Sequence, residues 1–319
     1  MKRRLDAVIV GAGPAGLSAA LFLRDFDLDV VLIEEGSQPG GQLNEIHAPI
    51  VNYLGTVGRR GEEVLGATLE DARAAGLSIL VGAPVTRIST RSRWVERAGD
   101  GAGGVERIQA RALVLATGLR RRALGVPGEA ELRGRGVSHS ANLDRQCFAG
   151  RLVVVVGGGT AAVEDAILCA EVGSPVTLLH RSSRFRARED FLARARAHSS
   201  IRFVVNATVT AIEGGEAVEG VRYRVGRGRA GRGGQEKSVA CAGVFVRVGW
   251  EPRTELVRRQ LRCDRAGFIH AGAAGVTSVP WVFAAGDVCA PGCPSVANAV
   301  GQGAAVAWEV GRRLGRVRG

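Results

Sequence analysis

The sequence predicts an α/β protein made of two Rossmann-like units of three-layer ββα architecture, the second inserted into the first. The main observation is an internal repeat, because the pattern of Ile9–Glu35 returns at Val155–Arg181, 146 positions later. Both copies read as an apolar strand, a glycine-rich turn, a helix and a second apolar strand. The composition agrees, since 46% apolar residues and 46 glycines suit a globular α/β chain.

The turn in each copy has the spacing of a dinucleotide-binding motif. The first glycine makes the tight turn, the second admits the pyrophosphate, and the third position needs a small residue for helix–strand packing. The diphosphate then lies on free N–H groups at the helix N-terminus. These positions are Gly11, Gly13 and Gly16 in the first copy and Gly157, Gly159 and Ala162 in the second.

The residue that ends the second strand differs in charge between the copies. Glu34 can accept hydrogen bonds from a ribose 2′-OH, as in FAD or NAD, and would repel a 2′-phosphate. The second copy has His180 there, followed by guanidinium groups that suit a phosphate, those of Arg181, Arg184 and Arg186. Two dinucleotides of different charge indicate a redox enzyme.

The outer parts of the chain, residues 1–118 and 249–319, are expected to form one interrupted domain. The first contains the first motif, a helix over Gly61–Ala75 and strands separated by an exposed hairpin loop at 91–104, whose glycines favour a turn. The last ends in a helix over Ala297–Leu314, whose N-terminus is expected to face a cofactor.

The middle segment, residues 119–248, is the more basic part. It has 21 Arg and Lys against 12 Asp and Glu, whereas the rest has 22 against 19, for a total charge of +12. A basic surface there would steer an acidic protein or a phosphorylated cofactor. A compositional habit is the alternative, because only two of the 43 basic residues are lysine. The segment closes with short strands around a loop at 226–235, expected to be solvated.

Several other classes of protein are excluded by the sequence. No apolar stretch approaches the ~20 residues that span a bilayer, and the apolar run after the basic N-terminus is too short for a signal peptide. We therefore expect a soluble, cytoplasmic protein. Six cysteines in this length do not make a disulfide framework, and no His/Cys cluster has metal-ligand spacing. No nucleic-acid recognition motif accompanies the positive charge.

The motifs, in their order, resemble those of the low-molecular-weight thioredoxin reductases over nearly the whole chain. They are GAGPAG, GGQL at Gly40–Leu43, Asn52-Tyr53, ATG, GGGTAAVEDA, HRSSRFRA and FAAGDV. The resemblance implies a discontinuous FAD-binding domain (1–118 and 249–319), an inserted NADPH-binding domain (119–248) and a homodimer.

The resemblance also implies which residues bind the cofactors. Those for FAD are Gly11, Gly13, Ala15 and Gly16 at the diphosphate, Glu34 at the adenosine ribose, Gln42 and Asn52 near the flavin, Asp287 at the ribityl chain, and Gly118 and Gly286 within the same motifs. Those for NADPH are Gly157, Gly159, Thr160, Arg181 and Arg186.

The sequence departs from the family at its redox centre. The family's Cys-Ala-Thr-Cys-Asp falls on Ser140–Asp144, so that neither cysteine is present. Serine and leucine cannot form the disulfide that a dithiol relay requires. Asp144 remains, either as an N–H acceptor in a turn or as a proton source near the flavin. His139 beside it could orient or protonate a substrate, or be structural.

Three functions stay open at this point. The first is an FAD-dependent NADPH oxidoreductase that passes electrons directly to an external acceptor. An acidic ferredoxin or flavodoxin is favoured, as in relatives without the CxxC such as ferredoxin/flavodoxin:NADP reductases. The second is a disulfide reductase or dithiol oxidase that uses Cys289 and Cys293, which flank a Pro-Gly turn. The third is a non-catalytic flavoprotein sensor or binding subunit.

Overall fold

The computed structural model describes residues 4–46, 49–99, 104–226, 234–290 and 292–317. The chain forms two compact units, Met1–Arg120 with Glu251–Gly319 and Arg121–Trp250. Each boundary lies two residues after the one expected from the sequence. The chain leaves and re-enters the first unit through β7 (Leu119–Arg121) and β16 (Trp250–Pro252), which pair as a two-stranded ribbon. The mixed α/β fold with parallel sheets confirms the expected fold class.

The outer unit is built on one sheet in the order β3-β2-β1-β6-β5-β4, with β17 also paired to β6. Strands β3, β2, β1, β6 and β17 are parallel, whereas β4 and β5 are antiparallel to their neighbours. The strands are β1 (Arg4–Val10), β2 (Val30–Ile33), β3 (Ser78–Leu80), β4 (Val85–Ser89), β5 (Trp94–Ala98), β6 (Val105–Leu115) and β17 (Val282–Ala284).

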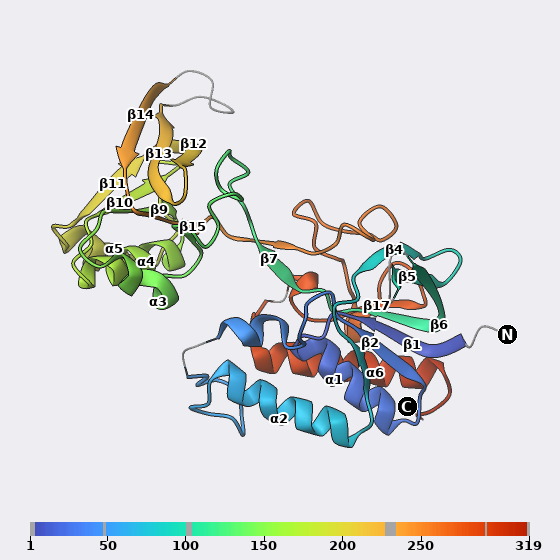
Figure 1. The fold of residues 1–319 in the computed structure, drawn as a ribbon. Coiled ribbons are helices and arrows are strands. Elements are labelled where there is room, and N and C mark those ends of the chain that lie inside the picture. The colour runs from blue at the N-terminus through green and yellow to red at the C-terminus, as the bar shows by residue number, and fades with distance from the viewer. Residues whose placement is uncertain (1–3, 47–48, 100–103, 227–233, 291, 318–319) are drawn as a thin grey trace. The chain divides into compact units, whose positions relative to one another are not determined.

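Helices cover one face of this sheet. Figure 1 shows α1 (Pro14–Asp25), α2 (Gly61–Ala74) and α6 (Val296–Arg313) together on that face. One core lies between these helices and the sheet, and a second core, which includes Trp281, lies on the sheet's other face. Short 3₁₀ helices, which shape the loops, are η1 (Gly41–Glu45), η4 (Ala273–Gly275) and η5 (Asp287–Cys289).

Strand β6 joins two kinds of sheet. Its last residues are buried on both faces between β1 and β17, as in a parallel sheet covered on both sides. Its first half alternates and pairs with β5. The expected hairpin loop at 91–104 is wrong in this respect, because β5 lies inside it. The charged residues of this segment are typical of an exposed loop, yet Glu96 and Arg97 are buried. Glu96 forms an ion pair with Arg107, and Arg97 forms one with Glu106.

The inserted unit also combines a parallel sheet, helices and antiparallel strands. A parallel sheet of order β11-β10-β9-β15-β8 carries helices, and an antiparallel sheet β12-β13-β14 packs beside it. Its elements are β8 (Val137–Ser138), α3 (Ala141–Asp144), η2 (Arg145–Phe148), β9 (Val153–Gly157), α4 (Thr160–Glu171), β10 (Val176–His180), α5 (Glu189–Ala197), β11 (Ile201–Val205), β12 (Ala207–Gly214), β13 (Val218–Val225), β14 (Gln235–Ala240) and β15 (Gly243–Arg247).

Most of the loop expected at 226–235 lies outside the described residues. Among the described residues, no helix is long and apolar enough to cross a membrane. The same part of the chain contains no cluster of three or more His, Cys, Asp or Glu side chains that could hold a metal ion.

Candidate functional site

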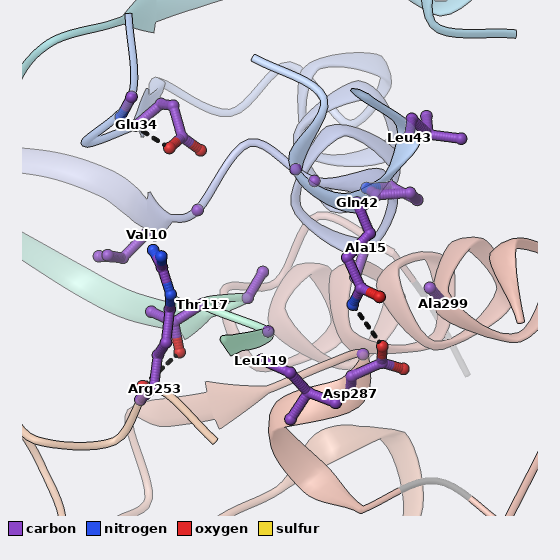
Figure 2. Close-up of a pocket in the computed structure, with 18 of the residues that line it drawn as sticks. Val10, Ala15, Glu34, Gln42, Leu43, Thr117, Leu119, Arg253, Asp287 and Ala299 are labelled. Atoms are coloured by element: carbon purple, nitrogen blue, oxygen red, sulfur yellow. Dashed lines mark hydrogen bonds between the residues drawn. The ribbon is translucent and has the colours of Figure 1, made fainter. Parts of the chain in front are cut away.

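A cavity of about 840 Å³ in the outer unit lies at the carboxyl ends of its parallel strands (Figure 2). This edge of an open α/β sheet is where dinucleotides bind. The expected residues that line this dinucleotide cavity are Gly11, Gly13, Ala15, Glu34, Gln42, Gly118, Gly286 and Asp287. Residues from motifs that are far apart in the sequence therefore line one cavity.

In the glycine turn at the end of β1, two of the three motif glycines have no room for a side chain. Gly11 has φ +102°, and a Cβ there would lie 2.4 Å from the carbonyl oxygen of Ala116, directly after β6. A Cβ on Gly16 would lie 1.9 Å from the carbonyl oxygen of Gly11. Gly16 therefore does not line the cavity but lets α1 pack against the turn. Helix α1 begins after Gly13 without a side-chain cap, so its first N–H groups are available to an anion.

Glu34 is held rigidly at the end of β2. One carboxylate oxygen accepts the N–H of Ala12 at 2.8 Å, and the other accepts the N–H of Gly36 at 2.9 Å. Each oxygen keeps a further lone pair for a ligand hydroxyl. The carboxylate is thus fixed in an orientation that leaves it able to accept hydrogen bonds from a ligand.

Gln42 and Asp287 meet across the cavity although they are 245 positions apart. The Gln42 amide nitrogen donates to an Asp287 carboxylate oxygen at 2.7 Å, as Figure 2 shows. Gly286, with φ +79°, turns the chain before η5, and its N–H donates to the Gln302 side chain on α6 at 2.7 Å. The third sequence segment therefore closes the site opened by the first.

Arg253 lines the same cavity and was not expected from the sequence. Its guanidinium pairs with Glu35, and Figure 2 places the side chain against the cavity beside Thr117. Its buried Nε has no hydrogen-bond partner among the described residues. An orphaned donor of this kind fits a bound anionic or polar ligand.

Asn52 is a sequence prediction that the structure does not support. The side chain is exposed and is not part of the cavity lining. Ile50 points inward instead, and its backbone bonds to Arg59 and Gly58 close the loop on itself. Val51 and Asn52 are both exposed where the chain bends after Ile50, so Asn52 is on the outer side of this loop.

The second glycine turn is equally tight in the inserted unit. A Cβ on Gly157 would lie 2.3 Å from the carbonyl oxygen of Arg247, and one on Gly158 would lie 2.1 Å from the His180 ring. Gly159 has nothing within 4 Å and precedes α4, whose first N–H groups have no side-chain cap. The Thr160 hydroxyl accepts the N–H of Arg188 at 3.1 Å and fixes the loop after β10 to the helix start.

His180 supports the loop that follows β10 in the inserted unit. Its Nε2 lies 2.9 Å from the carbonyl oxygen of Arg184, and its ring lies 4.7 Å from that of Phe185. Burial, followed by the nearby arginines, lowers the pKa of His180. A neutral His180 shapes the loop, while Arg181, Arg184 and Arg186 are exposed on it and have no carboxylate partner among the described residues.

The segment Ser138–Asp144, where the resemblance led us to expect a dithiol, is held by two networks. The Ser138 hydroxyl donates to Asp144 at 2.5 Å and accepts the N–H of Ser140 at 3.1 Å. Asp165, fully buried on α4, accepts the N–H of Ala141 at 3.2 Å and pairs with Arg247 through contacts of 2.6 and 2.9 Å. The Asp165–Arg247 pair, absent from the sequence predictions, fixes α3 to α4 and β15.

His139 lies half-buried next to this segment. Its Nδ1 is 3.3 Å from the carbonyl oxygen of Val246. Burial lowers the pKa of His139, and the positive charges of Arg133 and Arg121 act in the same direction. A neutral ring that donates to Val246 is the form favoured near neutral pH.

Cys289 and Cys293 are not brought together as a disulfide. Both are free thiols. Cys289 packs against the core on the far side of the sheet, and burial, with Asp287 nearby, raises its pKa to about 12. Cys293 is exposed. A thiol with a raised pKa is a poor nucleophile, so this geometry does not favour a redox pair.

Comparison with known proteins identifies the class. A profile of the pyridine nucleotide-disulphide oxidoreductase family matches residues 5–303. The thioredoxin reductase of Mycolicibacterium smegmatis is 37% identical over 97% of this chain and 96% of that protein, and that of Bacillus subtilis is 32% identical over 96% and 93%. The chain therefore belongs to this family and is thioredoxin reductase-like.

Solved structures support the same thioredoxin reductase-like assignment. The thioredoxin reductase of Lactococcus lactis superposes with a TM-score of 0.77 at 30% identity and covers 98% of this chain and 100% of that one. The bacillithiol disulfide reductase of Bacillus cereus has the same TM-score at 20% identity, a likeness of fold alone. The chain is an NADPH-dependent flavoprotein oxidoreductase, as the sequence predicted, and the family uses FAD and NADPH. The non-catalytic alternative loses its support.

Proposed function

We propose that the chain is an NADPH-dependent flavoprotein reductase whose electrons reach an external acceptor without a protein dithiol at positions 140 and 143. FAD would occupy the dinucleotide cavity, and NADPH would lie on the second glycine turn with its 2′-phosphate near Arg181 and Arg186. When bound, FAD supplies the two-electron chemistry between NADPH and the acceptor.

The observation that carries this proposal is the composition of the segment Ser140–Asp144, which includes α3. Ser140 and Leu143 stand where the resemblance requires cysteines, and no two cysteines anywhere in the sequence are separated by two residues. Leu143 is half exposed and Asp144 is bonded to Ser138. This segment can present a hydroxyl, a carboxylate and an apolar side chain, none of which forms a disulfide. We propose that Asp144 and His139 position the residues of this segment and do not react themselves.

Counting electrons tests the proposal. Anaerobic titration of the FAD-loaded protein with dithionite should consume two electrons per flavin, because FAD is the only two-electron centre. A redox-active disulfide would add two more, and an uptake of four electrons would contradict the proposal. The double variant S140C/L143C is the positive control. It should take up four electrons if the replaced positions lie where a dithiol would operate.

A disulfide is the acceptor class that the relatives support better than the ferredoxin or flavodoxin favoured by charge. The relatives are named as thioredoxin reductases. An acidic redox protein is supported by the excess positive charge of residues 119–248. The prereduced protein should be mixed anaerobically with oxidised thioredoxin, a low-molecular-weight disulfide, ferredoxin and flavodoxin. The fastest reoxidation of the flavin identifies the class.

A disulfide reductase or dithiol oxidase could still use Cys289 and Cys293. If it does, Cys293→Ser should abolish turnover of disulfides while NADPH still bleaches the flavin. Full turnover by this variant would remove both cysteines from the mechanism. By the same family likeness we expect a homodimer, which light scattering of the purified protein would test.

A further inference from the structure

A second cavity of the outer unit has a volume of about 340 Å³ and four arginines in its wall. No acidic residue lines it. The lining residues are Arg4, Arg93, Arg111, Ala112, Pro280, Trp281, Phe283, Val310, Arg313 and Leu314. Arg4 begins β1 and Val10 ends it, so this arginine cavity and the dinucleotide cavity lie at opposite ends of a seven-residue strand, about 20 Å apart.

The charges around the arginine cavity do not balance. Arg111 pairs with Asp6 at 3.0 Å, and Arg313 pairs with Glu309 at 2.6 Å. Arg4 and Arg93 have no carboxylate partner among the described residues. Two guanidinium charges are therefore uncompensated beside two that are already held in place. Such a group favours an anion with several oxygens, because each planar guanidinium can donate two parallel hydrogen bonds.

Arg93 has a backbone conformation that favours another residue type. It lies in the turn between β4 and β5 with φ +54°, where glycine or asparagine carries less strain. Its guanidinium lies 5.9 Å from the centre of the Trp281 ring, and the indole N–H of Trp281 donates to the carbonyl oxygen of Thr90 in the same turn at 2.7 Å. The turn and the cavity wall are thus joined, and the strained residue supplies one of the unpaired charges.

We propose that the arginine cavity binds a small oxyanion with two or more negative charges, of the phosphate-ester class. Arg4 and Arg93 would donate to it from the open side, while Arg111 and Arg313, oriented by Asp6 and Glu309, would complete the wall. The volume lies at the lower end of the range for small-molecule sites and admits a compact phosphorylated molecule.

Calorimetry with inorganic pyrophosphate tests this site. The full chain would be loaded with FAD and saturated with NADP⁺, so that both dinucleotide sites are filled, at constant ionic strength. Arg93→Gly should weaken pyrophosphate binding by roughly tenfold, as expected for a charge-assisted contact, while the melting temperature stays the same or rises. Arg4→Ala should weaken it similarly.

Arg91→Ala is the matched control, because Arg91 is exposed in the same turn and does not line the cavity. It removes the same charge and should leave the affinity within about twofold. Equal loss in Arg91→Ala and Arg93→Gly would mean general attraction to a basic surface and would overturn the proposal. So would the absence of binding to the unaltered protein, or full affinity in Arg93→Gly.

Discussion

Arg253 is the side chain in the dinucleotide cavity with an unsatisfied buried donor, its Nε. Arg253→Met keeps the length of the chain and removes the guanidinium. We expect the dissociation constant for FAD to rise about tenfold, because a hydrogen bond to a charged group is lost. Flavin fluorescence during titration of the apoprotein measures this. Arg120→Met is the control, since Arg120 lines the same cavity but is paired with Glu251 and Glu255. An equal loss in both variants would contradict the assignment.

We propose that single residues also decide the choice between NADPH and NADH. Arg181 and Arg186 are exposed without a carboxylate partner among the described residues, whereas Arg188 pairs with Asp190 at 2.6 Å. We expect Arg181→Ala and Arg186→Ala each to raise KM for NADPH about tenfold, through loss of a phosphate contact, with little change for NADH. Steady-state kinetics with both nucleotides checks this. Arg188→Ala should be close to neutral.

At the scale of elements, the packing of α1 on its turn depends on Gly16. A Cβ there would lie 1.9 Å from the carbonyl oxygen of Gly11, so Gly16→Ala must push α1 away from β1. We expect a loss of at least about 2 kcal/mol in unfolding free energy, the range for overpacked sites. Gly66→Ala in α2 has open space and should be stabilising by about 0.5 kcal/mol. Chemical denaturation of both variants makes the comparison.

The Asp165–Arg247 pair connects α4, β15 and α3. Asp165→Ala would leave the guanidinium of Arg247 largely buried without its partner, and we expect a loss of about 3 kcal/mol in the stability of the inserted unit. Glu171→Ala on the same helix removes an exposed pair with Arg194 at 3.5 Å and should cost less than about 1 kcal/mol. Thermal denaturation measures both losses. Similar losses from the two changes would show that the buried pair contributes no more to stability than the exposed pair.

Local motifs predicted these elements and much of the site. Glu34, Gln42 and Asp287 are in the cavity because each belongs to a short motif that specifies its own backbone. Arg253 follows an ordinary strand, and only the fold brings it to the cavity. Asn52 lies exposed outside the cavity lining, because the motif did not specify which side of its loop faces inward. The strand β5 was missed because its buried charges look like a surface loop until Arg107 and Glu106 lie beside them.

For the whole molecule, charge separates the two classes of acceptor. Residues 119–248 carry 21 basic against 12 acidic side chains. If the acceptor is an acidic protein, its reduction rate should fall at least tenfold between low salt and about 0.5 M salt, because steering is screened. A neutral small disulfide should show almost no change. Stopped-flow reoxidation of the flavin across a salt series distinguishes these outcomes.

The sequence alone determined that two dinucleotide units are present, that one is nested in the other, and that no dithiol occupies positions 140–143. These properties are local, because a glycine turn, a strand-end carboxylate and a missing sulfur act within a few residues. Only the tertiary structure decided that Gln42 meets Asp287, that Asp165 holds Arg247, and that four arginines from separate segments surround one cavity. Contacts between side chains far apart in sequence depend on how strands and helices pack, and no motif spacing encodes that.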